Sequence, residues 1–178
     1  MAGRRGDERA WIRGAQRGSV SDLEALFRHH WPKAYRAAYL VVHDAGAAED
    51  IAQEAFLAAV RGLDRFDRRR PFGPWLHRIV VNRAIDWSRA RALRRESGNA
   101  ALELVASPAA PDNPHAQTLA AALAQLSPEH RAVIVLRHLL EYTPGEIGEV
   151  LGLPRGTVNS RLRRGLDELA ARFGEELR

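Results

Sequence analysis

Apolar residues recur at intervals of three and four along almost the whole chain, and this spacing limits the fold more than any other feature. It is the period of α-helices that bury one side, and the two-residue alternation of half-buried strands is not sustained. The pattern breaks over residues 96–116, where Pro108, Pro111 and Pro114 lie among small and polar residues, as is typical of a linker. The sequence therefore predicts an all-α protein of two small helical domains, residues 1–95 and 117–178, joined by a flexible linker at 96–116.

Boundary signals divide each half into helices. Ser21 and Glu24 have the spacing of a capping box at the start of a second helix, and Pro32 is expected to kink that helix or restart it. The other helices before the linker are expected at about 7–17, 47–63 and 74–95. Three or four shorter helices are expected after it, at about 117–125, 128–140, 144–151 and 155–173.

Positive charge is concentrated in one block of the chain. The 178 residues contain 27 basic and 22 acidic residues, but positions 61–95 alone contain eleven basic and three acidic ones. A smaller cluster of four arginines without an acidic residue lies at 155–164. Such blocks indicate a polyanion partner, most simply nucleic acid, although a solvated helix face is the alternative.

Composition excludes several classes of protein. The chain has no cysteine, which excludes a disulfide scaffold and a thiolate zinc site. No run of about 18 apolar residues indicates a membrane-spanning helix, and the N-terminus lacks the apolar segment of a secretory signal. We therefore expect a cytoplasmic location.

Residues 144–173 have the pattern of a helix-turn-helix. A short helix is followed by the turn Gly152-Leu153-Pro154 and by a second helix with an apolar spine. We expect that spine to comprise Val158, Leu162, Leu166, Leu169 and Phe173. The opposite face would enter a DNA major groove, where arginine reads guanine and asparagine reads adenine; it holds Arg155, Asn159, Ser160, Arg163 and Arg164. A helical hairpin with solvated arginines is the alternative.

The expected helix at 74–95 has two stripes. Its apolar stripe comprises Leu76, Ile79, Val80, Ala84 and Trp87. A second stripe suits single-stranded DNA, because aromatic rings stack on bases and arginines hold phosphates; it comprises Trp75, Arg78, Asn82, Asp86 and Arg89. The alternative is an amphipathic helix with a chance aromatic.

The expected helix at 47–63 places Asp50, Gln53 and Glu54 on one face. Ile51, Ala55 and either Leu57 or Phe56 would cover its other sides. Taken alone, this pattern favours a plain amphipathic helix.

Three segments resemble regions of the extracytoplasmic-function (group 4) bacterial RNA polymerase sigma factors. The string A-E-D-x-x-Q-E-x-F at 48–56 is similar to region 2.2, and RPFGPWLHRIVVNRAIDWSRAR is similar to regions 2.3 and 2.4. The segment LSPEHRAVIVLRHLLEYTPGEIGEVLGLPRGTVNSRLRRGLDEL resembles region 4. They occur in the family's order, and the resemblance as a whole covers roughly residues 7–95 and 117–173, which leaves only the linker and the termini unmatched.

The resemblance implies a transcription initiation factor that binds core RNA polymerase, directs it to −35 and −10 promoter elements and assists DNA melting. Asp50, Gln53 and Glu54 would bind the β′ clamp helices, and the second domain would touch the β flap. The −10 element would be held by the loop Asp64 to Gly73 and the following helix, through Arg65, Phe66, Arg69, Trp75, Arg78, Asn82, Asp86 and Arg89. Arg155, Asn159, Ser160, Arg163 and Arg164 would face the −35 element. An anti-sigma factor is the further partner implied, and no cofactor or metal is expected.

Two other functions are alternatives to an initiation factor. The histidines form no H-E-x-x-H motif, and the chain has neither a P-loop nor a serine-elbow motif, so an enzyme is disfavoured. A stand-alone helix-turn-helix repressor would explain residues 144–173, but it would not need Trp75, Asn82 and Asp86 on a basic helix.

Overall fold

The computed structural model describes residues 2–96 and 114–176, and these form eight α-helices, one 3-10 helix and no strand. The all-α prediction is therefore confirmed. In chain order the elements are α1 (Ala2–Ala15), α2 (Val20–Val42), α3 (Ala45–Gly62), η1 (Leu63–Arg65), α4 (Phe72–Glu96), α5 (Pro114–Ala124), α6 (Pro128–His138), α7 (Pro144–Leu151) and α8 (Arg155–Glu176). Most of the expected linker lies outside the described residues, although its last three positions belong to α5.

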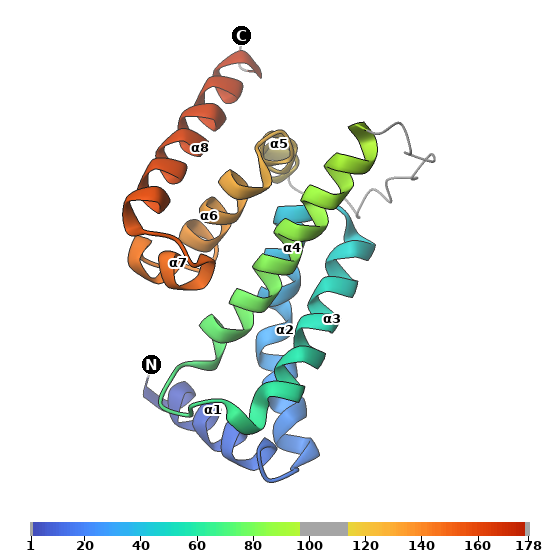
Figure 1. The fold of residues 1–178 in the computed structure, drawn as a ribbon, viewed down its shortest axis with the longest axis vertical. Helices are drawn as coiled ribbons and strands as arrows, with labels where there is room; N and C mark the ends of the chain where they lie inside the picture. The colour runs from blue at the N-terminus through green and yellow to red at the C-terminus, as the bar shows by residue number, and fades with distance from the viewer. Residues whose placement is uncertain (1, 97–113, 177–178) are drawn as a thin grey trace.

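Helices α2, α3 and α4 lie side by side, and α1 lies across one end of them (Figure 1). Small residues allow this close packing, because alanines on the facing sides of α2 and α3 are fully buried. They are Ala34, Ala37, Ala38, Ala48, Ala52 and Ala55. Phe56 is buried and Leu57 is 57% exposed, which settles which of the two covers α3.

The expected start of α2 was wrong, and the helix does not restart at Pro32, whereas a kink at that proline stays a prediction. Ser19, rather than Ser21, caps the helix: its backbone is extended and its hydroxyl accepts a hydrogen bond from the Asp22 N–H. The helix also continues through Pro32. Because α2 packs against α1, α3 and α4, these contacts outweigh the one backbone hydrogen bond that a proline removes.

Helices α6, α7 and α8 form the helix-turn-helix half. Thr143 and Glu146 make a complete capping box at the start of α7, and Gly152 ends the helix with a φ of 67°. Val158, Leu162 and Leu169 are buried as expected, but Leu166 is 42% exposed, so its place in the spine was wrong. Gly165 is buried instead, because α6 approaches α8 too closely for a side chain there.

The two halves of the chain pack against each other. Helix α2 contacts α5 and α6, and α4 contacts α6 and α7. This explains why α4 buries more than its expected stripe: Leu76, Val80 and Ala84 are buried, but so are Val81 and Ile85. Both halves contribute to one continuous hydrophobic core.

Replacement of Gly148 by alanine tests the tight turn between α7 and α8. A Cβ at this position would lie 2.6 Å from the backbone oxygen of Leu153, which cannot move without opening the turn. We expect Gly148→Ala to lower the free energy of unfolding by about 1–3 kcal/mol, measured by urea denaturation. A Cβ at Gly156 meets nothing within 4 Å, so Gly156→Ala is the matched control and should be neutral or stabilising. Equal denaturation midpoints for both variants would contradict this account.

Candidate functional site

The basic loop between α3 and α4 is built over aromatic side chains. Phe66 and Phe72 are buried, with ring centroids 5.7 Å apart. The loop residues that follow Phe66 are exposed, including Arg69, and so is Arg65 just before it. The predicted site residues Arg65 and Arg69 therefore lie on the surface, whereas Phe66 lies beneath it.

Trp75 belongs to this aromatic group. Its ring centroid lies 4.7 Å from that of Phe66 and 5.5 Å from that of Phe72. A Cβ on Gly62 would come within 3.3 Å of the same ring, so the glycine leaves room for it. Trp75 is only partly exposed, and its ring supports the loop from below.

The predicted DNA-binding stripe of α4 does not form one surface. Arg78 is exposed beyond Trp75, whereas Asn82, Asp86 and Arg89 line a groove between the two halves of the chain. Across this groove the Arg89 guanidinium donates to the Glu129 carboxylate at 2.7 Å. The other residues that line it are Ile85, Leu151, Leu153 and Arg161.

The predicted polymerase-binding residues lie on the exposed side of α3. Asp50, Gln53 and Glu54 are all exposed, and Glu54 accepts a hydrogen bond from Arg83 of α4 at 2.6 Å. Asp50 and Glu54 also line a second groove, whose other wall comes from α4. Leu57 and Val60 are exposed apolar residues that continue the outer surface of α3. The sequence prediction for this face included polar residues only, so it did not contain these two.

Helix α8 is the second helix of the helix-turn-helix and is termed the recognition helix. It exposes four of its five predicted DNA-binding residues, namely Arg155, Asn159, Arg163 and Arg164. Ser160 is partly buried, and its hydroxyl donates to the Thr157 carbonyl oxygen at 2.9 Å. A basic, solvent-facing surface on the second helix of a helix-turn-helix can enter a DNA major groove.

Besides the pair Arg89 and Glu129, two other polar contacts between the halves were not predicted from the sequence. The buried Arg131 guanidinium donates to the backbone oxygens of Val41 and Leu126, and burial lowers the pKa of Arg131 to about 10. His77 Nδ1 lies 2.7 Å from the Tyr142 hydroxyl oxygen. Both contacts join residues far apart in sequence, so spacing along the chain gives no signal for them.

The described residues provide neither a metal-binding cluster nor a membrane-spanning helix. These contain no group of three or more His, Cys, Asp or Glu side chains placed to hold a metal ion. None of their helices is long and apolar enough to cross a membrane.

Comparison with known proteins gives matches in both halves. The family described as Sigma-70 region 2 matches residues 26–94, and the family Sigma-70, region 4 matches residues 122–171. The ECF RNA polymerase sigma factor SigW of Bacillus subtilis is 34% identical over 172 residues, covering 89% of this chain and 90% of SigW. The RNA polymerase sigma factor CarQ of Myxococcus xanthus is 33% identical over 163 residues, covering 89% and 92% of the two chains.

Two solved structures share the fold. CnrH, determined in complex with the cytosolic domain of CnrY, superposes with a TM-score of 0.71 at 28% identity, covering 95% of this chain and 98% of CnrH. The sigma factor RpoE of Bartonella quintana, determined with the anti-sigma factor NepR, has a TM-score of 0.69 at 23% identity. The two chains are covered to 84% and 95% in that superposition.

Burial of the His77 ring should make stability depend on pH. Burial, followed by the nearby His30 and Lys33, lowers the pKa of His77 from 6.5 to about 3, so the folded protein holds this ring neutral. As the pH falls below 6.5, the unfolded chain takes up a proton that the folded chain refuses, and stability is lost. We expect His77 to account for a loss of about 1–2 kcal/mol between pH 7.5 and 5, measured by urea denaturation.

Two variants separate His77 from the other histidines. His77→Asn should be less stable than wild type at pH 7.5 but lose less stability on acidification. His138 is exposed, so His138→Asn should keep the wild-type pH dependence. An unchanged pH dependence in His77→Asn would show that this ring is not the group that titrates.

Proposed function

The chain belongs to the extracytoplasmic-function sigma factors of the sigma-70 family, and on that premise we propose how its surfaces divide the work of transcription initiation. A member of this family is an RNA polymerase-binding, promoter-specific initiation factor. We assign residues 1–95 to a region 2-like domain, 96–116 to a linker and 117–178 to a region 4-like domain. The observation that supports this division best is the presence of an acidic α3 face, a basic loop and a basic recognition helix in separate places on the fold.

The face of α3 is proposed to bind the clamp helices of the polymerase β′ subunit. Asp50, Gln53 and Glu54 are exposed together, and Asp50 and Glu54 open onto a groove. The exposed Leu57 and Val60 add apolar area beside them. A polar group next to apolar area is the usual make-up of a protein interface.

The 64–73 loop and the adjoining part of α4 are proposed to melt and hold the −10 element. Arg65 and Arg69 would contact phosphates, as would Arg78. The packing of Trp75 favours a supporting role for this ring, with its exposed edge offered to a base. Asp86 and Arg89 are already exposed at the groove that they line, whereas the partly buried Asn82 would become more available to DNA once that groove has opened.

The recognition helix α8 is proposed to read the −35 element. Arg155, Asn159, Arg163 and Arg164 are the exposed residues that would contact bases and phosphates. Ser160 would contribute less, because its hydroxyl already donates within the helix.

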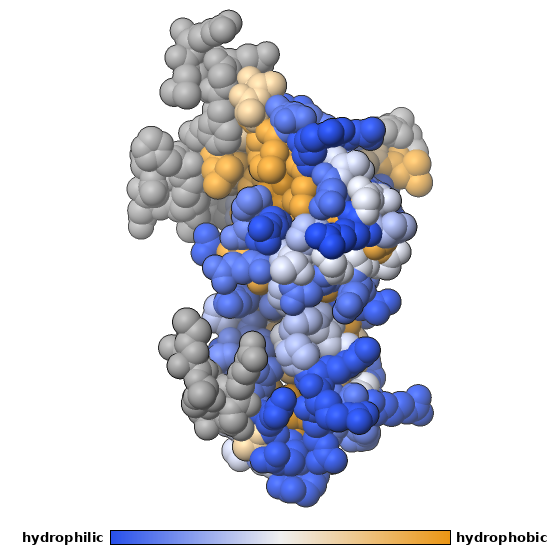
Figure 2. Space-filling view, turned by 90° about the vertical axis from the view of Figure 1, so that its left-hand side faces the viewer, coloured by the Kyte–Doolittle hydropathy of each residue, from blue (hydrophilic) through white to orange (hydrophobic). Residues whose placement is uncertain are grey.

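The helix-turn-helix half has apolar surface as well. Leu119 of α5 and Leu166 of α8 are exposed, and Figure 2, which faces the side where α8 lies in Figure 1, shows apolar residues gathered in its upper half. Exposed apolar area of this kind marks a protein interface, and we assign it to the polymerase β flap. RpoE was solved with the anti-sigma factor NepR, and CnrH was solved with the cytosolic domain of CnrY, so we further propose an anti-sigma partner and a cytoplasmic location for this chain.

Reconstitution with bacterial core RNA polymerase tests the function. We expect the protein to co-elute with core enzyme and to support promoter-specific run-off transcription, which a stand-alone repressor would not do. Combined replacement of Asp50, Gln53 and Glu54 by alanine should weaken core binding about tenfold or more, since each rim contact alone contributes modestly. Glu24→Ala, on the exposed surface of α2, is the control. Unchanged core affinity in the triple variant would refute the assignment of this face.

A second experiment tests the −35 surface. We expect Arg163→Ala to cost about 1–3 kcal/mol in promoter binding and to relax base preference at one position. The control is Arg36→Ala, an exposed arginine of α2. Binding is measured by footprinting over salt concentration and over −35 variants. A loss that is equal for all sequences and reduces the salt dependence would mean that Arg163 contacts phosphate only.

A further inference from the structure

We propose that α1 and the turn that follows it position the 64–73 loop, and that Glu8 of α1 and Gln16 of the turn are the positioning residues. This inference rests on the function proposed above for the loop. Helix α1 lies outside residues 26–94, the segment that matches Sigma-70 region 2. Glu8 of α1 and Gln16, the first residue after α1, nevertheless contact the two ends of the loop, whereas the exposed middle of the loop contacts neither of them.

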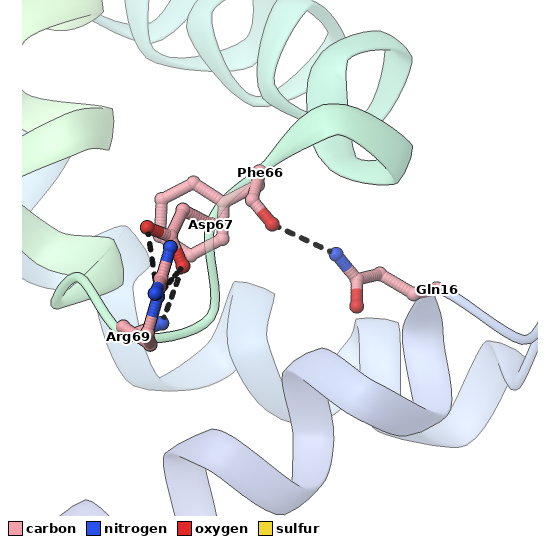
Figure 3. A network of polar contacts seen from close by, with 4 residues as sticks. All are labelled: Gln16, Phe66, Asp67 and Arg69. Carbon is pink, nitrogen blue, oxygen red and sulfur yellow. Dashed lines mark hydrogen bonds and ion pairs between the residues drawn. The ribbon is translucent and has the colours of Figure 1, made fainter.

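Gln16 holds the beginning of the loop. Its side-chain amide nitrogen donates to the backbone oxygen of Leu63 at 2.9 Å. The same nitrogen donates to the backbone oxygen of Phe66 at 3.1 Å, the contact drawn in Figure 3. Leu63 begins the 3-10 helix η1 and Phe66 follows it, and the Leu63 oxygen also accepts from the Phe66 N–H at 3.0 Å. One side chain from the turn after α1 therefore holds both ends of η1, where the chain leaves α3.

Glu8 holds the end of the loop. Its carboxylate oxygen Oε1 accepts a hydrogen bond from the backbone N–H of Phe72, the first residue of α4, at 3.2 Å. His30 Nε2 lies 3.4 Å from the same oxygen, and this neighbour lowers the pKa of Glu8. An ionised carboxylate at a helix N-terminus satisfies a free N–H group and is favoured by the helix dipole.

Between these two points the exposed part of the loop has only local polar contacts among those that the structure shows. Asp67 accepts hydrogen bonds from the backbone N–H and the side-chain Nε of Arg69, both at 3.0 Å, which closes a small turn. Arg68 and Arg70 are exposed beside it. The position of these arginines relative to α4 is thus set by the aromatic residues beneath the loop and by α1 and the turn after it at its ends.

A positioning role predicts a particular defect. If the loop is displaced, the arginines meet the separating strands less well, while core binding and the fold are retained. The apolar residues of α1 support the fold itself, since Ile12 is 1% exposed and Trp11 packs against the core. Gln16 and Glu8 differ from them because their contacts are hydrogen bonds to the loop.

The test uses holoenzyme containing Gln16→Met, which keeps the length of the side chain but removes the amide. Open-complex formation is followed by permanganate reactivity of unpaired thymines. Loss of two hydrogen bonds should slow opening of a duplex promoter about tenfold. A template already melted at the −10 element should restore activity, and affinity for core enzyme should not change. Gln125→Met, at an exposed glutamine after α5, is the matched control and should behave as wild type.

Glu8 offers a conservative pair of variants. Glu8→Gln keeps an oxygen that can accept from the Phe72 N–H, whereas Glu8→Leu does not. We expect Glu8→Gln to open duplex promoters closer to the wild-type rate than Glu8→Leu. Hydrogen exchange followed by mass spectrometry adds a readout independent of transcription: amides of residues 64–73 should exchange faster in Gln16→Met, and those of α2 should not.

The outcomes separate this inference from the function on which it rests. A variant with both Arg65→Ala and Arg69→Ala tests the loop directly, because these are the exposed loop arginines proposed to contact phosphates, and wild-type opening by that variant would refute the melting function. If that variant opens poorly but Gln16→Met opens normally, the loop melts DNA and the positioning role of Gln16 is wrong. A Gln16→Met protein that is equally defective on melted templates, or that binds core enzyme poorly, would also overturn the proposal, because the residue would then support the fold in general.

Discussion

A single buried guanidinium fixes how the two halves of this molecule meet. Arg131 of α6 donates to the backbone oxygen of Val41, near the end of α2, and to that of Leu126, just before α6 begins. The last carbonyl groups of a helix have no helical partner, so the cation satisfies one of them while receiving the hydrogen bonds that its own burial demands. With α6 fixed against α2 in this way, α7 and α8 follow, because both pack on α6.

Helix α4 carries most of the consequences of that packing. One side belongs to the bundle with α2 and α3, another is covered by α6 and α7, and its first residues meet the loop that α1 holds. Three proposed events therefore depend on this one helix. They are polymerase binding at the groove between α3 and α4, promoter melting at the loop before α4, and opening of the groove between α4 and the second half of the chain. A movement of α4 at any of these places would also move the residues of α4 at the other two.

Local sequence patterns predicted what local forces determine. The helix-turn-helix, the α7 boundaries and the exposed arginines of α8 follow from spacing, capping and turn residues, and the structure has them where expected. Contacts between distant segments were missed, as with Arg131, the pair His77 and Tyr142, and Gln16 on the loop. A periodic pattern also cannot show that α4 is covered on a second side or that Trp75 turns its ring inward, since both depend on which surfaces meet in the folded chain.

The contacts between the two halves compete with any partner that binds between them. A partner that needs α4 and α8 separated binds only the open fraction of the population, so its apparent dissociation constant equals the intrinsic one divided by that fraction. The ion pair between Arg89 and Glu129 and the contact between His77 and Tyr142 both favour the closed population. A substitution that strengthens either contact would lower the affinity for every such partner by the same factor, although it changes no surface to which a partner binds. A substitution that weakens either contact would raise the affinity for all of these partners by a common factor.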